Sequence, residues 1–272
     1  MEDFTYTRPA SLADAIAVHG DADDAMYMAG GQTLIPVLKQ GLAMPTDVVD
    51  LGAVWELDGI AVSGGFVTIG AMTRHAVVAA SKDVRAAIPA LTVLAGGIGD
   101  AQVRNRGTIG GSLANNDPSA DYPSAVMGLG ATIVTDRREL TAEDYFDGMF
   151  ATNLEPGEII KAVKFPVPEK AGYAKFPNPA SRYALVGVFV AKTAPGSGGG
   201  VRVAVTGAGQ DGVFRAAEIE DALNNNFSAD ALAGVTVPAD GLMTDMHADA
   251  AYRANLIGVM AKRAVKQANG QG

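Results

Sequence analysis

The stretch TIGGSLANNDPSADYPSA, residues 108–125, places two adjacent glycines after a short apolar segment and then turns to proline, serine and aspartate. Residues 29–40, AGGQTLIPVLKQ, contain a similar glycine pair that follows an apolar segment and precedes a hydroxyl-bearing residue. Phosphate-binding loops usually include a lysine, yet residues 108–125 contain no basic side chain. Any anion held at this stretch would therefore be bound mainly by the main chain.

Paired glycines can expose the backbone to a ligand. Because glycine has no Cβ, it adopts positive φ angles and lets a ligand touch the main chain. Successive amides in such a turn form a concave anion site, and a helix that begins beyond it adds its positive end. Two such turns, with hydroxyls from Thr33 and Ser112, could grip a diphosphate, and Asp121 suits a ribose hydroxyl. Either glycine pair alone also fits an ordinary tight turn.

The composition is that of a globular chain and excludes several classes of function. The 272 residues are 48% hydrophobic and 19% charged, and the net charge of −9 argues against partners such as nucleic acid or anionic membranes. The absence of cysteine excludes disulfides, thiolate zinc sites and iron–sulfur clusters held by this chain. No signal-peptide pattern and no apolar run of ~18 residues are present, so we expect no membrane span and a cytoplasmic location.

Apolar periodicity and turn residues predict a mixture of helices and strands. Helices are expected at residues 11–20 with Ser11 as cap, within 34–41, at 73–99 with an interruption at Pro89, at the start of 125–136, and at 216–225 and 250–268. Strands are expected at 25–28 and 47–52, in a hairpin at 60–71, at the end of 125–136, as an edge strand bounded by Pro166 and Pro168, and in a hairpin whose arms, 183–192 and 200–209, flank the loop 193–199.

The two glycine motifs, in this order, resemble the flavin-binding signatures of the medium, FAD-binding subunit of the molybdenum hydroxylases. That family includes bacterial enzymes of the xanthine dehydrogenase and carbon monoxide dehydrogenase type. Further agreement lies in EPGEIIKAVKFPVP at 155–168, RYALVGVFVA at 182–191, and MTDMHADAAYRANLIGVMAKRAV at 243–265. The resemblance covers residues 4–266, which is essentially the whole chain.

The resemblance implies an α+β fold in which a two-subdomain FAD-binding unit of the PCMH/VAO type precedes a C-terminal domain. The expected domains are FAD-binding subdomains at 1–57 and 58–168, then a C-terminal flavoprotein domain with a small antiparallel sheet and helices at 169–272. The cofactor implied is FAD, with its pyrophosphate held by residues 29–33 and 108–112 and its ribose side by Asp121.

The same resemblance places Ile98 against the isoalloxazine, Ile160 near the adenine end and Tyr183 near the flavin ring. Tyr183 also fits a core tyrosine that begins a strand. The full set of expected cofactor-binding residues is Met28, Ala29, Gly30, Gly31, Gln32, Thr33, Ile98, Thr108, Ile109, Gly110, Gly111, Ser112, Asp121, Ile160 and Tyr183.

The function implied is electron transfer, in an oxidoreductase with three kinds of subunit. A large partner would carry the molybdopterin cofactor that hydroxylates the substrate, and a small partner would carry two 2Fe-2S clusters. Electrons would pass from those clusters to the FAD of this chain and on to an external acceptor, in a dimer of heterotrimers. The lack of cysteine agrees with this division, and no catalytic acid–base pair or metal site is expected here.

One position departs from the family pattern. Many relatives carry a lysine just before the Arg-Tyr-Ala element, where it can reach the flavin. In KFPNPASRYA, residues 175–184, Pro177 and Asn178 stand at that place and Lys175 lies slightly upstream. A cationic side chain near the flavin ring is therefore in question.

Other interpretations compete with the family assignment. Gly207, Gly209 and Gly212 have dinucleotide-binding spacing after a strand, but no second parallel strand follows. The three histidines show no metal-ligand spacing, and His75 is expected at the surface or at a helix start. The pair Arg104 and Arg106 fits a solvated face or a docking or phosphate contact. A stand-alone flavin-dependent oxidoreductase, or a non-enzymatic partner without flavin, are the alternative functions.

Overall fold

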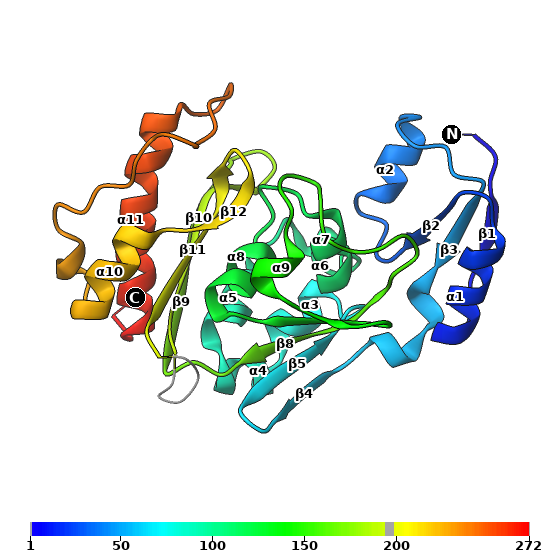
Figure 1. Ribbon diagram of the computed structural model, residues 1–272, viewed down its shortest axis with the longest axis horizontal. Coiled ribbons are helices and arrows are strands. Elements are labelled where there is room, and N and C mark those ends of the chain that lie inside the picture. Colours follow the sequence, from blue (N-terminus) through cyan, green and yellow to red (C-terminus); the bar gives the residue numbers. More distant parts are fainter. Residues whose placement is uncertain (1, 194–198, 272) are drawn as a thin grey trace.

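Three β-sheets follow one another along the long axis of the molecule, and helices fill the space between them (Figure 1). This arrangement is seen in a computed structural model that describes residues 2–193 and 199–271. The expected α+β class is confirmed. Within the described ranges, no helix is both long and apolar enough to cross a membrane.

The first sheet is small and parallel, with strand order β1-β3-β2. The predicted helix α1 begins as expected, because the Ser11 side chain accepts a hydrogen bond from the backbone amide of Asp14. The first glycine motif is the connection between β2 and α2. The elements are β1 (Thr5–Thr7), α1 (Leu12–Asp21), β2 (Ala25–Met28), α2 (Leu34–Lys39), β3 (Asp47–Asp50), η1 (Leu51–Ala53) and η2 (Trp55–Leu57).

The second sheet is antiparallel, with strand order β4-β5-β8-β6-β7. The prediction of an edge strand before Pro166 is wrong, because β8 lies at the centre of this sheet. Pro166 occupies the last position of β8 opposite Phe66, so its missing N–H interrupts no interior part of the ladder. The strands are β4 (Ile60–Ser63), β5 (Phe66–Gly70), β6 (Thr132–Thr135), β7 (Glu139–Thr141) and β8 (Ile160–Pro166).

Short helices cover this second sheet and carry the second glycine motif. The predicted helical stretch 73–99 is divided at Ser81, whose side chain caps the next helix, and again before Pro89, which occupies the first turn of a third. The helices are α3 (His75–Ala80), α4 (Lys82–Ala87), α5 (Pro89–Gly96), α6 (Ala101–Arg104), α7 (Ile109–Asn115), α8 (Tyr122–Leu129) and α9 (Ala142–Tyr145).

The third sheet is antiparallel, with strand order β12-β11-β10-β9. The predicted hairpin of β10 and β11 is confirmed, although most of its loop, 194–198, lies outside the described residues. The Gly207-x-Gly209-x-x-Gly212 spacing belongs to an antiparallel turn from β11 to β12, which removes the dinucleotide-binding interpretation. The elements are β9 (Lys170–Pro177), β10 (Ala184–Lys192), β11 (Val201–Gly209), β12 (Gly212–Arg215), α10 (Ala217–Asn225), η3 (Asp230–Leu232) and α11 (Ala250–Ala268).

The third sheet packs on both of its faces. Tyr173 and Phe189 join the core beneath the second sheet, whereas Val188 and Val203 join a separate core with the long helix α11. One face of the C-terminal sheet therefore helps to fix the helices that surround the glycine motifs. The domain boundaries at residues 57 and 168 stay predictions.

Candidate functional site

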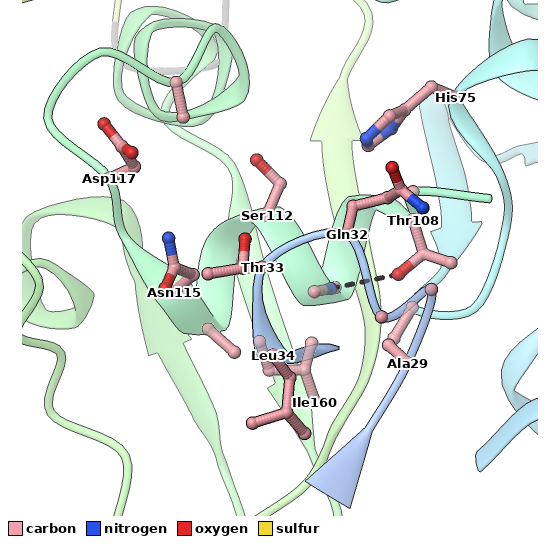
Figure 2. Close-up of a pocket in the computed structure, with 18 of the residues that line it drawn as sticks. Ala29, Gln32, Thr33, Leu34, His75, Thr108, Ser112, Asn115, Asp117 and Ile160 are labelled. Atoms are coloured by element: carbon pink, nitrogen blue, oxygen red, sulfur yellow. Dashed lines mark hydrogen bonds between the residues drawn. The ribbon is translucent and has the colours of Figure 1, made fainter. Parts of the chain in front are cut away.

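A cavity of about 650 Å³ lies between the loop that follows β2 and the helix α7 (Figure 2). Its size is typical of a pocket for a cofactor-sized ligand. Two of the predicted residues do not line it: Met28, whose sulfur lies behind Gly31, and Ile109, which is fully buried. The predicted residues that do line the cavity are Ala29, Gly30, Gly31, Gln32, Thr33, Ile98, Thr108, Gly110, Gly111, Ser112, Asp121, Ile160 and Tyr183.

The first glycine motif supplies unpaired backbone donors to this cavity. Gly31 has a φ of 71°, in the left-handed region that favours glycine. Within residues 2–193 and 199–271, the amides of Gly31, Gln32 and Thr33 have no hydrogen-bond acceptor, and the Thr33 side chain makes no capping bond. Gly31 is half-buried, and Gln32 and Thr33 are exposed, so these amides can donate to a ligand or to solvent. The loop can therefore offer a row of donors to an anion, and the predicted role of residues 29–33 in holding the pyrophosphate stays a prediction.

The second glycine motif is built differently from the expected turn, because Gly110 and Gly111 lie inside the first turn of α7. The Gly110 amide donates to the Ala71 carbonyl at 2.8 Å, and the Gly111 amide donates to the Thr108 hydroxyl at 3.1 Å. These amides are already paired, so they do not form a second row of donors. The glycines serve close packing instead: a Cβ on Gly111 would lie 3.3 Å from the Ala29 Cβ.

The two glycine motifs touch each other just before α7. A Cβ built on Gly30 would lie 2.0 Å from the carbonyl oxygen of Arg106 and 2.9 Å from the Cα of Gly107. The backbone of the loop after β2 therefore packs directly on the backbone of the segment before α7. The side chain of Arg104 has a separate role, because its Nη1 holds the Ile98 carbonyl at 2.9 Å and the Gly99 carbonyl at 3.0 Å.

Asp121 borders the cavity, but its carboxylate is already engaged. The side chain is 4% exposed, accepts a hydrogen bond from the Tyr173 hydroxyl, and pairs with the Lys175 ammonium at 2.9 Å. Burial raises the pKa of Asp121, and the Lys175 charge opposes that rise. A carboxylate has about four acceptor positions, so further hydrogen bonds to Asp121 are possible.

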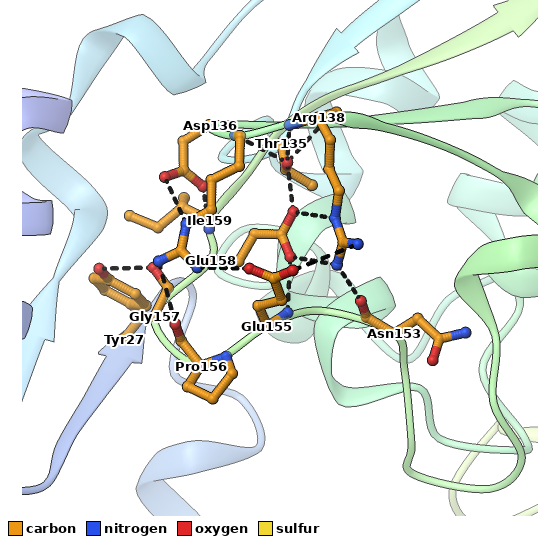
Figure 3. A network of polar contacts seen from close by, with 11 residues as sticks. Tyr27, Thr135, Asp136, Arg138, Asn153, Glu155, Pro156, Gly157, Glu158 and Ile159 are labelled. Carbon is orange, nitrogen blue, oxygen red and sulfur yellow. Dashed lines mark hydrogen bonds and ion pairs between the residues drawn. The ribbon is translucent and has the colours of Figure 1, made fainter.

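Sequence reasoning assigned no role to Glu158, which lies at the centre of a polar network on the cavity wall (Figure 3). Its side chain is 0% exposed and pairs with Arg138 at 2.9 Å. It also accepts hydrogen bonds from the Thr135 hydroxyl and the Glu155 amide, each at 2.7 Å. Burial alone would raise the pKa of Glu158, but these bonds lower it to about 2. The network fixes the turn that leads into Ile160.

The N-terminal sheet is joined to that turn through Tyr27. The Tyr27 hydroxyl donates to the Gly157 carbonyl at 3.4 Å, and the Tyr27 ring stacks on His19 with centroids 4.3 Å apart. Burial raises the pKa of Tyr27 to about 12, so its hydroxyl stays protonated and able to donate. The network therefore ties two walls of the cavity together.

His75 is a second cavity residue to which the sequence analysis assigns no role in the site. It begins α3, as one expectation had it, but it is 5% exposed and lines the cavity rather than the surface. Its Nδ1 is buried with no hydrogen-bond partner among the described residues, and its ring packs on Tyr122 with centroids 5.4 Å apart. Burial, assisted by the charge of Arg104, lowers the pKa of His75 to about 4.

The lowered pKa of His75 predicts a loss of stability in mild acid. The unfolded chain binds a proton near pH 6.5, whereas folded His75 stays neutral down to about pH 4. The free energy of unfolding should therefore fall below pH 6.5, by at most about 1.4 kcal/mol per pH unit from this group. Urea denaturation between pH 6.5 and 5 should show that slope in wild type and in His247→Gln, an exposed control, but not in His75→Gln. An unchanged slope in His75→Gln would contradict the assignment.

Comparison with known proteins identifies the family of this chain. The family described as the FAD binding domain in molybdopterin dehydrogenase matches residues 2–168. The chain is 38% identical to the carbon monoxide dehydrogenase medium chain of Afipia carboxidovorans, covering 97% of this chain and 96% of the relative. It is 34% identical to the nicotine 6-hydroxylase medium subunit of Paenarthrobacter nicotinovorans, with the same coverage of both chains.

A solved structure shares the whole fold. The reconstituted CO dehydrogenase from Oligotropha carboxidovorans superposes with a TM-score of 0.88 at 33% identity, covering 100% of this chain and 99% of that chain. The predicted family is thus confirmed over both the glycine motifs and the C-terminal sheet. This chain belongs to the medium, FAD-binding subunits of the molybdenum hydroxylases, oxidoreductase complexes of the carbon monoxide dehydrogenase and xanthine dehydrogenase type.

Proposed function

We propose that this chain binds FAD in the cavity between the glycine motifs and passes electrons from partner iron–sulfur clusters to an external acceptor. The observation that carries the proposal is the row of amides at Gly31, Gln32 and Thr33, which lack an acceptor within residues 2–193 and 199–271 and line the same cavity as Gly110 and Gly111. A concave set of backbone donors suits a diphosphate without a lysine.

The remaining walls suit the other parts of FAD. The hydroxyls of Thr33 and Ser112 would support the diphosphate, and Ile160 would contact the adenine end. Ile98 and Tyr183 would border the isoalloxazine ring, and Asp121 stays the proposed partner of the ribose side. Bound FAD would supply the electron-accepting and electron-donating chemistry, while these residues position it and exclude water.

The partners proposed are a large subunit with the molybdenum cofactor and a small subunit with two 2Fe-2S clusters, assembled as a dimer of heterotrimers. Support comes from the relatives, which are named as medium chains or medium subunits. The chain has no cysteine, so the clusters must be held by another subunit. Two of the acidic residues in the cavity lining, Asp121 and Glu158, are already held in ion pairs with Lys175 and Arg138, which agrees with a chain that carries electrons rather than activating a substrate.

The direction of electron flow can be tested with the proposed small iron–sulfur subunit, purified separately. That protein is reduced chemically, freed of reductant and mixed with the FAD-loaded chain under anaerobic conditions. The flavin absorption should bleach while the cluster absorption returns to its oxidised form. The same mixture with a chain freed of FAD should leave the clusters reduced. A flavin that stays oxidised beside reduced, bound clusters would contradict the proposed direction.

A further inference from the structure

Lys175 is a buried cation that joins three separate segments around the cavity. Its side chain is 8% exposed, and its Nζ lies 2.9 Å from an oxygen of Asp121. The same ammonium donates to the Gly97 carbonyl at 2.8 Å and to the Arg182 carbonyl at 3.0 Å. Asp121 at the start of α8, the end of α5 and the turn before β10 are thus held by one group.

The first of these segments is the loop that carries Ile98. Lys175 takes the carbonyl of Gly97, and Arg104 takes the next two carbonyls, those of Ile98 and Gly99. Three successive carbonyls are therefore turned toward cations. The Gly99 backbone borders the cavity, and its amide has no acceptor within residues 2–193 and 199–271. Lys175 and Arg104 therefore turn the carbonyls of this loop toward themselves and leave the Gly99 amide available at the cavity.

The second segment is the turn that carries Tyr183. Arg182 has a φ of 62°, which is uncommon for a residue other than glycine and is strained. Asn178 closes the turn, because its carbonyl accepts from the Arg182 amide at 2.9 Å and its amide donates to the Tyr183 carbonyl at 2.8 Å. The bond from Lys175 to the Arg182 carbonyl stabilises this strained conformation.

Lys175 also neutralises Asp121 in a place closed to solvent. Asp121 is 4% exposed, and its other partner, the Tyr173 hydroxyl, brings no charge of its own. Removing one member of a buried ion pair leaves the other without compensation, which is costly in a medium of low dielectric constant. Asp121 borders the cavity, so loss of either charge of the pair would leave a net charge that acts on any ligand bound there.

We propose that Lys175 and Asp121 form a charge-compensated positioning pair that holds the two walls next to the flavin ring and sets the flavin reduction potential. This inference rests on the proposed function, which puts the ring between Ile98 and Tyr183. Reduction adds negative charge to the cofactor, so a nearby positive charge favours the reduced form and a nearby negative charge opposes it.

Lys175 lies two positions before Pro177 on β9. Residues i and i+2 of a strand point to the same face, so Lys175 and Pro177 of β9 share one side. A lysine two positions upstream therefore reaches the same region of the molecule. It acts through Asp121 and two carbonyls, and it does not line the cavity itself.

Four variants of the full chain loaded with FAD test the electrostatic part: Lys175→Met, Asp121→Asn, the double variant, and the control Lys170→Met. Lys170 lies on the same strand, and its ammonium bonds to Asn269 far from the pair. The flavin midpoint potential is measured by equilibrium reduction against a redox dye at alkaline pH, where Asp121 keeps its charge.

The potential should fall in Lys175→Met, rise in Asp121→Asn, and return close to the wild-type value in the double variant and the control. A merely structural role would move both single variants in the same direction and the double variant further. Equal potentials in all variants, or shifts of one sign, would overturn the proposal.

Amide hydrogen exchange tests the positioning part without FAD. Exchange at residues 97–99 and 182–183 should be faster in Lys175→Met than in wild type and unchanged in Lys170→Met. Equal exchange in all three chains would overturn the proposal that Lys175 holds these two segments in place. A wild-type chain that binds no FAD would instead count against the proposed function, so the two failures are distinguishable.

Discussion

Replacing Gly30 with alanine should weaken FAD binding by about tenfold to a hundredfold. The new Cβ would lie 2.0 Å from the Arg106 carbonyl oxygen, a distance that no real Cβ contact reaches. Because the obstacle is backbone, rotation of a side chain cannot relieve it, and the two motifs must move apart. Overpacking of this kind costs about 1–3 kcal/mol, and each 1.4 kcal/mol lost from binding is tenfold in Kd.

The matched control is Gly20→Ala, because a Cβ at Gly20 would meet no heavy atom within 4 Å. Gly20 lies in α1, where alanine is the better helix former, so this variant should bind FAD like wild type and be slightly more stable. Circular dichroism shows whether each variant is folded, and equilibrium titration gives its Kd for FAD. A folded Gly30→Ala chain with wild-type affinity would show that the contact between the motifs does not shape the site.

Replacing Glu158 with alanine should produce the largest loss of stability, about 1–3 kcal/mol, because it removes a fully buried carboxylate and leaves its hydrogen-bond donors without an acceptor. The substitution leaves Arg138, the Thr135 hydroxyl and the Glu155 amide without their common acceptor. Urea denaturation measures the change in the free energy of unfolding. Glu155→Ala is the control, since its side chain is 55% exposed and its ion pairs are worth about 0–1 kcal/mol.

The pH dependence of Glu158 has a defined sign. Its pKa in the folded chain, about 2, lies below the ordinary value of 4.5. The stabilisation is therefore complete above about pH 4.5 and is lost as the pH falls toward 2. The acid branch of the stability profile should be shallower in Glu158→Gln than in wild type. Equal losses of stability in Glu158→Ala and Glu155→Ala would contradict the claim that Glu158 is the central acceptor of the network.

The sequence was a good guide where local patterns decide the structure. Ser11 caps its helix as expected. The two apolar arms of the β10–β11 hairpin pair with each other, as their position on either side of a loop rich in glycine and serine indicates. The edge-strand prediction is wrong because Pro166 stands at the end of β8, where its missing N–H does not require an unpaired edge. Proline at the end of a strand is also compatible with a central position, and only tertiary contacts decide between the two.

The site was predicted in part. The two glycine pairs look alike in the sequence, yet Gly31 lies in a loop whose amides find no acceptor in the described part of the chain. Gly110 lies inside a helix whose first amides are paired. The difference depends on Ala71 and Thr73, which accept from α7 and are distant in the chain. The ion pairs of Glu158 with Arg138 and of Lys175 with Asp121 are not predictable from the sequence for the same reason, since the partners lie many residues apart.

The most direct test of the account is the visible absorption of the purified full chain after incubation with FAD and removal of free flavin. We predict a retained flavin spectrum with one FAD per chain, which Gly30→Ala weakens and Gly20→Ala leaves intact. The titration is repeated with the copurifying partner subunits present. A chain that retains no flavin in either experiment would contradict the central claim that the cavity between the glycine motifs is an FAD site.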